Sequence, residues 1–113
     1  MTRFKVVLVP FPFDDLSASK VRPAVCLTDS IGPYNHVVLA FITSRIPESL
    51  SETDLVITSG NDDFIATGLR VSSTLQLHRL MTASTSLLLR ELGMLPPNLQ
   101  KEVNARLRKL FKL

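Results

Sequence analysis

Short apolar runs, separated by polar segments and turn-forming residues, fill the first two thirds of the chain. Each run is rich in Val, Ile, Leu or Phe, and runs of this length and composition are typical of β-strands. One turn is indicated by Gly32-Pro33 and another by residues 60–63 (GNDD), where glycine, asparagine and aspartate gather. The strands predicted in this way span residues 6–11, 23–28, 37–43, 54–58, 69–72 and 74–80.

The last third of the chain has the spacing of helices. Thr82 has the side chain of an N-terminal cap for a short helix that runs to about residue 92 and ends at Gly93. Pro97 suits the first position of a final helix. Strands followed by helices predict a mainly β, small barrel closed against C-terminal α-helices, in one domain over residues 1–113. The apolar stripe of the final helix consists of Leu99, Val103, Leu107 and Leu110.

Composition places the chain among small globular proteins. Its 113 residues are 45% hydrophobic, which is enough for one domain with a core. Cys26 is the only cysteine, so it forms no internal disulfide, and a reducing, cytoplasmic setting is expected. No apolar run reaches the ~18 residues that a membrane span needs. The N-terminus lacks the small-residue cleavage site of a signal peptide.

The charge of the chain is small but unevenly spread. The formal net charge is +3, and residues 90–113 carry six basic side chains against two acidic ones. A basic surface suits a polyanionic or acidic partner. The same residues also fit the solvated face of a helix. Charge alone leaves both interpretations open.

One cation and one hydroxyl are predicted to meet at the end of a β-hairpin. If residues 21–44 form this hairpin and Thr28 faces Val37, the residue numbers of each pair of partners sum to 65. Arg22 then lies directly opposite Thr43, with Cβ atoms roughly 4.5–5.5 Å apart. Pro23 also favours an extended backbone at Arg22.

Arg22 has apolar neighbours on both strands of this hairpin, and neither strand offers an acidic partner. A guanidinium beside an apolar wall needs a counter-ion or water. A phosphate from outside the chain matches its planar fork of donors. The alternative is an arginine at a strand end whose head group reaches solvent.

Three segments resemble a known family. Residues 7–17 read VLVPFPFDDLS, residues 19–25 read SKVRPAV, and residues 40–44 read AFITS. Together they resemble the PemK-like branch of the MazF toxins of type II toxin–antitoxin systems, and the order of hydrophobic segments agrees over nearly the whole chain. The first two segments are the specific part of the resemblance, whereas the C-terminal part is mainly a hydrophobic pattern.

The resemblance implies an SH3-like barrel that forms homodimers and is neutralised by a cognate antitoxin. It also implies an endoribonuclease that cuts single-stranded mRNA at short sequences, with no metal or other cofactor, leaving a 2′,3′-cyclic phosphate and a 5′-hydroxyl. Matched motif to motif, the catalytic pair falls on Arg22 and Thr43, the same two residues that the hairpin register brings together. Arg22 is expected to stabilise charge, because its pKa above 12 makes it a poor base.

Further residues are expected to contact RNA. The loop over residues 13–20 is expected to close over the strand, with Phe13 as a stacking surface; alternatively it is a surface loop with a core phenylalanine. His78 serves as a base if it faces the Arg22–Thr43 site, and otherwise is a partly exposed strand histidine. The full set of expected RNA contacts is Phe13, Ser17, Ser19, Lys20, Ser44, His78 and Arg79.

The sequence departs from the family pattern at three places. Phe4-Lys5 replaces a Gly-Asp pair, His78 replaces an acidic residue, and Pro96 replaces a serine cap. The first two leave open a weakened enzyme or an inactive RNA-binding barrel. A gyrase-binding toxin of the related CcdB type is a further alternative, although it would not need Arg22 and Thr43. Two distant histidines and one cysteine make no zinc site.

Overall fold

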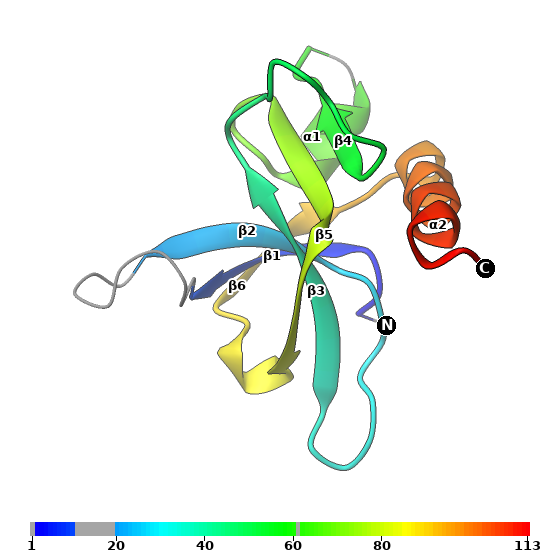
Figure 1. Cartoon of the computed structure of the whole chain (residues 1–113). Helices are drawn as coiled ribbons and strands as arrows, with labels where there is room; N and C mark the ends of the chain where they lie inside the picture. The colour runs from blue at the N-terminus through cyan, green and yellow to red at the C-terminus, as the bar shows by residue number, and fades with distance from the viewer. Residues whose placement is uncertain (1, 11–19, 61) are drawn as a thin grey trace.

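A single antiparallel sheet of six strands organises the protein. The computed structural model describes residues 2–10, 20–60 and 62–113, and the strands lie in the order β4-β5-β3-β2-β1-β6. Figure 1 shows the sheet strongly twisted, with β3 and β5 crossing the direction of β1 and β2. The mainly β prediction is therefore confirmed. The strands are β1 (Lys5–Pro10), β2 (Val21–Cys26), β3 (His36–Thr43), β4 (Asp54–Ile57), β5 (Ser73–Ser84) and β6 (Arg90–Met94).

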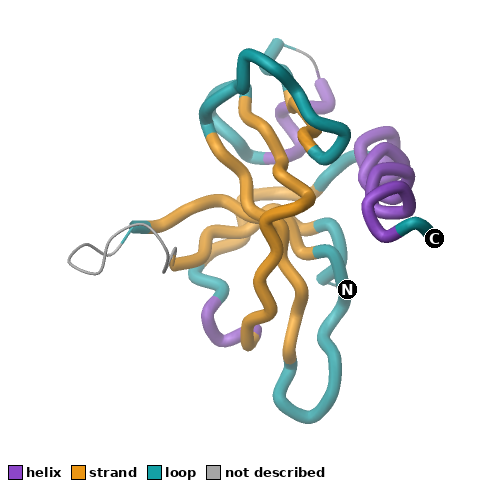
Figure 2. The backbone as a smooth tube through the Cα atoms, in the orientation of Figure 1, coloured by secondary structure: helices purple, strands orange, loops and turns teal. Residues whose placement is uncertain are grey.

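Three short or peripheral helical elements accompany the sheet: α1 (Asp62–Thr67), the 3-10 turn η1 (Thr85–Leu87) and α2 (Pro97–Phe111). Figure 2 shows that α2 stands beside the sheet, while most of the chain is strand or loop. The prediction that Pro97 begins the final helix is confirmed. Proline has no backbone N–H, and the N–H groups of the first turn of a helix have no carbonyl partner within the helix.

The two faces of the sheet each bury a hydrophobic cluster. Successive side chains of a strand point to opposite faces, so neighbouring residues such as Val6 and Val7 join different clusters. The first cluster includes Val25, Ile42 and Leu75 and extends to Val103 of α2. The second cluster consists of Val7, Val9, Ala24, Cys26, Val37, Leu39, Phe41 and Ala83.

Cys26 is fully buried in the second cluster. Burial raises the pKa of its thiol to about 11; the nearby Lys5 charge lowers it and Glu91 raises it, both by less. A thiol that is buried and stays protonated is unreactive and packs as a small apolar side chain.

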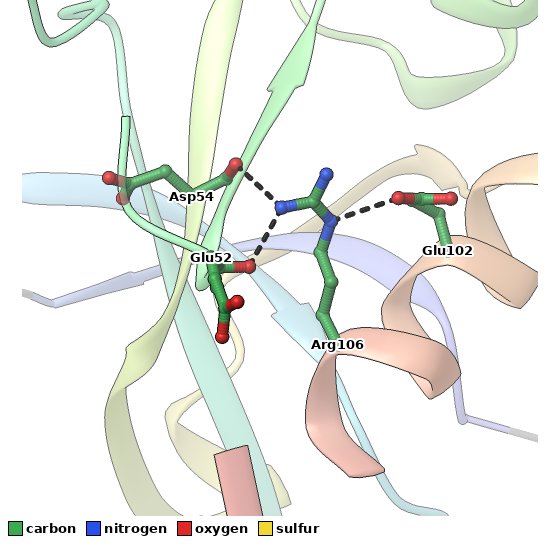
Figure 3. Close-up of polar contacts among 4 residues, drawn as sticks. All are labelled: Glu52, Asp54, Glu102 and Arg106. Carbon is green, nitrogen blue, oxygen red and sulfur yellow. Dashed lines mark hydrogen bonds and ion pairs between the residues drawn. The ribbon is translucent and has the colours of Figure 1, made fainter. Parts of the chain in front are cut away.

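Arg106 ties α2 to the sheet (Figure 3). Its Nη1 donates to the backbone carbonyls of Glu52 at 2.7 Å and Asp54 at 3.2 Å, just before and at the start of β4. Its Nε donates to the carboxylate of Glu102, one helical turn earlier, at 3.0 Å. Charge-assisted bonds of this kind hold the helix against the end of the strand.

A large bulge interrupts the pairing of β3 with β5. Ala40 pairs with Leu80 but its neighbour Phe41 pairs with Gln76, so residues 77–79 are extra on β5. Within the bulge the Leu77 N–H donates to the Thr53 carbonyl at 2.9 Å. Bulges change the direction of side chains on the longer strand. This bulge therefore determines the positions of His78 and Arg79.

Two glycines interlock α1 with β6. A Cβ on Gly68, which has φ of +72°, would lie 2.0 Å from the Leu92 carbonyl oxygen. A Cβ on Gly93 would lie 2.2 Å from the Ala66 carbonyl oxygen. The loop that follows α1 is thereby held against the edge of the sheet opposite β4.

Three sequence predictions are wrong. Residues 82–92 form no α-helix: β5 continues to Ser84, the three-residue 3-10 helix η1 turns the chain, and β6 pairs with β1. Residues 69–72, predicted as a strand, form the loop between α1 and β5. Residues 62 and 63, predicted as part of a turn, begin α1.

Candidate functional site

The register predicted for the β2–β3 hairpin is confirmed. Ala24 pairs with Phe41, and the next two pairs toward the turn keep the same sum of residue numbers. Arg22 and Thr43 lie two positions beyond Ala24 and Phe41, near the ends of the two strands. Arg22 also pairs with Val9 of β1, and Thr43 pairs with Thr74 of β5. The pair is therefore held from both sides by neighbouring strands.

Two clefts meet at this pair. The first has a volume of about 350 Å³ and the second about 560 Å³. Arg22, Ile42, Thr43 and Arg45 line both. The remaining lining residues of the first cleft are Lys20, Phe41, Gln76 and Arg79. Those of the second are Leu8, Pro23, Ser44, Gly68, Leu69, Arg70, Val71, Ser73, Arg90 and Leu92.

The clefts open on opposite faces of the sheet. Phe41 lines only the first cleft and belongs to one hydrophobic cluster, whereas Leu69 and Leu92 line only the second cleft and pack against the other cluster. Arg22 and Thr43, near the ends of β2 and β3, line both clefts.

Hydroxyl groups of two paired threonines fix the backbone of Arg45. Its N–H donates to Thr43 Oγ1 at 3.2 Å, and its carbonyl accepts from Thr74 Oγ1 at 2.9 Å. Thr74 is fully buried. Because the Thr43 oxygen accepts the Arg45 N–H, the Thr43 O–H can donate to a bound anion. Arg45 extends into both clefts.

The clefts are strongly cationic. Among their described lining residues there are six Lys or Arg side chains and no Asp or Glu. Converging guanidinium groups without carboxylates favour a ligand with phosphate groups. These cations are Lys20, Arg22, Arg45, Arg70, Arg79 and Arg90.

Comparison with known proteins identifies the family. The family model described as "PemK-like, MazF-like toxin of type II toxin-antitoxin system" matches residues 2–111. The chain belongs to this family. The resemblance predicted from the sequence is thus confirmed. A search of curated protein sequences found no match.

Solved structures of MazF toxins share the fold of this PemK-like chain. The toxin MazF-mt6 of Mycobacterium tuberculosis matches with a TM-score of 0.73 and 19% identity, over 96% of this chain and 97% of that one. An endoribonuclease in complex with its cognate antitoxin, from a mycobacterial species, matches with a TM-score of 0.71 and 18% identity, over 100% and 96%. The MazE–MazF structure of Deinococcus radiodurans matches with a TM-score of 0.69 and 16% identity, over 100% and 97%.

The site of this PemK-like chain gathers several of the residues expected to contact RNA. Lys20 and Arg79 line the first cleft, and Ser44 lines the second. The expectations for Phe13, Ser17 and Ser19 lie outside the described residues. No group of three or more His, Cys, Asp or Glu that could hold a metal occurs in ranges 2–10, 20–60 and 62–113.

His78 lies apart from Arg22 and Thr43. Its Nδ1 is 2.7 Å from Thr53 Oγ1, and it is not among the lining residues of either cleft. The bulge at residues 77–79 explains this position, because adjacent residues point in different directions and Arg79 is the one at the cleft. The arrangement gives no support to His78 as the base.

Three arginines that line the clefts were not predicted as site residues from the sequence. Arg45 lies only two residues after Thr43, and this closeness in sequence is a signal that could have identified it. Arg70 and Arg90 belong to segments whose structure was wrongly predicted. Within the described part of the chain, no helix is both long and apolar enough to cross a membrane.

Proposed function

We propose that this PemK-like toxin is a metal-independent endoribonuclease that cuts single-stranded mRNA at short specific sequences. The observation that carries the proposal is the junction, at Arg22, Thr43 and Arg45, of two clefts whose described lining residues include six Lys or Arg and no Asp or Glu. A phosphate at the junction meets two guanidinium groups and a hydroxyl. The RNA strand on either side of that phosphate then runs into a cationic cleft. Phosphate contacts of this kind provide most of the affinity for RNA.

The proposed reaction transfers the phosphoryl group within the RNA. The 2′-oxygen forms a bond to phosphorus and loses its proton to solvent, and the bond from phosphorus to the 5′-oxygen breaks. The leaving oxygen takes up a proton, so the products are a 2′,3′-cyclic phosphate and a 5′-hydroxyl. Negative charge grows on the phosphoryl oxygens in the transition state, where fixed donors are most effective.

Each residue at the junction has its own part. Arg22 stabilises the phosphoryl oxygens and offers an N–H to the leaving oxygen. Thr43 donates its O–H to a phosphoryl oxygen, since the Arg45 N–H already occupies a lone pair of the hydroxyl. Arg45 supplies the second positive charge from a backbone that two threonines hold in place.

We also propose that the toxin forms a homodimer and that a cognate antitoxin neutralises it. Two related structures, one mycobacterial and one from Deinococcus radiodurans, are described as complexes of a toxin with its antitoxin. An extended acidic segment of such a partner would fit the cationic clefts of this chain and would fold as it binds.

Incubation of the purified protein with a long single-stranded RNA in EDTA tests the proposal. Sequencing of the fragments and analysis of their ends should show recurrent cuts at one short sequence, with cyclic phosphates. The variants Arg22→Ala and Thr43→Val should each lower the cutting rate by about 10²-fold or more, as removal of an oxyanion donor does. Lys109→Ala, which removes an exposed cation of α2, is the matched control.

Either of two results would overturn the proposal. One is intact RNA from a folded wild-type protein. The other is cutting that persists in both Arg22→Ala and Thr43→Val, which would place the chemistry at another site.

A further inference from the structure

One row of cross-strand partners forms the floor of the second cleft. Leu8 of β1 pairs with Pro23 on one side and with Arg90 on the other. Ile42 of β3 is the position that follows Phe41, the partner of Ala24, so the same register continued by one pair sets it beside Pro23. All four line the second cleft. Four strands thus contribute an apolar floor that ends in a cation at Arg90.

The loop between α1 and β5 forms the opposite wall. Leu69 and Val71 line the cleft with Leu92 of β6. The contact of Gly68 with the Leu92 carbonyl holds this loop in place, and Ser73 Oγ donates to the Val71 carbonyl at 2.8 Å. Val71 leaves 54% of its surface exposed. Leu69, Val71 and Leu92 are apolar, and Arg70, between the first two in sequence, adds a positive charge to the lining.

The chemistry at the junction requires the bases beside it to separate. Attack by the 2′-oxygen needs the attacking and leaving oxygens roughly in line through phosphorus. Stacked neighbouring nucleotides do not reach that geometry, and proteins that read single-stranded RNA splay its bases apart. With the phosphate at Arg22 and Thr43, the two flanking nucleotides fall on opposite faces of the sheet, one toward each cleft.

We propose that the second cleft binds the nucleobase of one nucleotide that flanks the scissile phosphate. The inference rests on the proposed function. The apolar residues that line the first cleft are Phe41 and Ile42, both buried, whereas the second cleft offers Leu8, Leu69 and Val71 to the faces of a base. Arg70 and Arg90 also line this cleft and can bond base edges or the next phosphate. Its volume of about 560 Å³ lies in the range of small-molecule sites.

A tryptophan placed in the cleft provides the test, because the chain contains none. Val71→Trp would be titrated with a random-sequence octanucleotide whose 2′-oxygens are methylated, so that it cannot be cut. A ribose-phosphate octamer without bases is the comparison ligand. Ile65→Trp is the matched control, since Ile65 is 75% exposed on α1 and lines neither cleft.

The octanucleotide should quench Val71→Trp and leave Ile65→Trp unchanged, and the abasic octamer should quench neither. Stacking on the new indole should also tighten binding of the octanucleotide about fivefold. In sequencing of cut sites, Val71→Trp should change the base frequencies at one position beside the cut, whereas Ile65→Trp should keep the wild-type pattern.

The outcomes separate the two proposals. Binding of the octanucleotide, seen by fluorescence anisotropy, without quenching of Val71→Trp overturns the nucleobase site alone. Equal quenching by the abasic octamer means that the cleft binds only the phosphate chain. Absence of any binding by wild-type protein overturns the ribonuclease proposal and this inference together.

Discussion

Arg45 shows how a single side chain is positioned through its backbone. The threonine hydroxyls on either side, Thr43 and Thr74, bond to its N–H and its carbonyl. Thr74 touches no ligand in the proposed mechanism, so its contribution is to hold Arg45 and, through it, the orientation of the Thr43 hydroxyl.

Replacement of Thr74 therefore tests positioning. We expect Thr74→Val to lower kcat for RNA cleavage about tenfold and to destabilise the fold by ~1 kcal/mol, the usual cost of one lost hydrogen bond. Thr74→Ser keeps the hydroxyl and should restore kcat even if its smaller side chain leaves the stability reduced. Cleavage kinetics and urea denaturation measure the two effects. A kcat that follows stability rather than the hydroxyl would mean that Thr74 is only a core residue.

Cys26 carries a prediction about pH. Burial raises the pKa of its thiol from 9.0 to about 11. The unfolded chain therefore loses this proton first, and the folded protein should lose stability as pH rises from about 9 toward 11. Cys26→Ala has no thiol to ionise, so the difference in unfolding free energy between the two proteins should shrink over this range. Urea denaturation at pH 8 and pH 10 measures it; a constant difference would contradict the shift.

At the scale of elements, the contact between α1 and β6 shapes one wall of the site. Gly68 and Gly32 have nearly equal φ values, +72° and +71°, but only Gly68 faces another backbone. Gly68→Ala should cost ~3 kcal/mol, from the left-handed conformation and the clash with Leu92. Gly32→Ala should cost only the conformational part, ~1 kcal/mol.

Thermal denaturation of the two alanine variants measures the contrast. Cleavage by Gly68→Ala should also fall, because its loop forms a wall of the second cleft. Similar stability of the two variants would show that α1 and β6 adapt to each other without cost.

Local patterns predicted the β2–β3 hairpin because the residues that determine its register are close together in the sequence. The apolar segments and the turn around Gly32 set the register of β2 and β3, and that register, continued two positions beyond Ala24 and Phe41, places Arg22 opposite Thr43. The strand assignments of β1 and β4 likewise agree with the structure to within one or two residues at each described end. The core of the site was thus predictable from sequence.

The segment after β5 was not predictable in the same way. Its leucines suit a helix locally, but β1 has a free edge on that side of the sheet, and β6 fills it. The pairing of Leu8 with Arg90 joins residues from opposite ends of the chain. The bulge at residues 77–79 also could not be predicted from the alternation of apolar and polar residues along a strand. It gives the side chains of His78 and Arg79 different directions.

At the scale of the whole molecule, the clefts join into one cationic path across the strand ends. Binding of single-stranded RNA should weaken with salt, and each phosphate contact should contribute about 0.7 to the slope of log Kd against log salt. Arg45→Gln should lower this slope by about 0.7, because Arg45 extends into both clefts. Lys109→Gln, on the exposed side of α2, should leave the slope unchanged.

Titrations of fluorescent 2′-O-methyl RNA at several salt concentrations give these slopes. Equal slopes for wild type and Arg45→Gln, with a fall in Lys109→Gln, would move the RNA path onto α2. The basic C-terminal helix would then bind the polyanion, and the clefts would have another ligand.

The buried state of Cys26 also determines how the protein can be labelled. A thiol that is covered and keeps its proton at pH 7 should not react with maleimides, so a cysteine added at the surface would be the only site of attachment. Fluorophore or spin-label pairs on opposite sides of the strand ends can then be introduced without first removing the native cysteine. Distances between toxin and RNA become measurable in a protein whose core keeps its natural sequence.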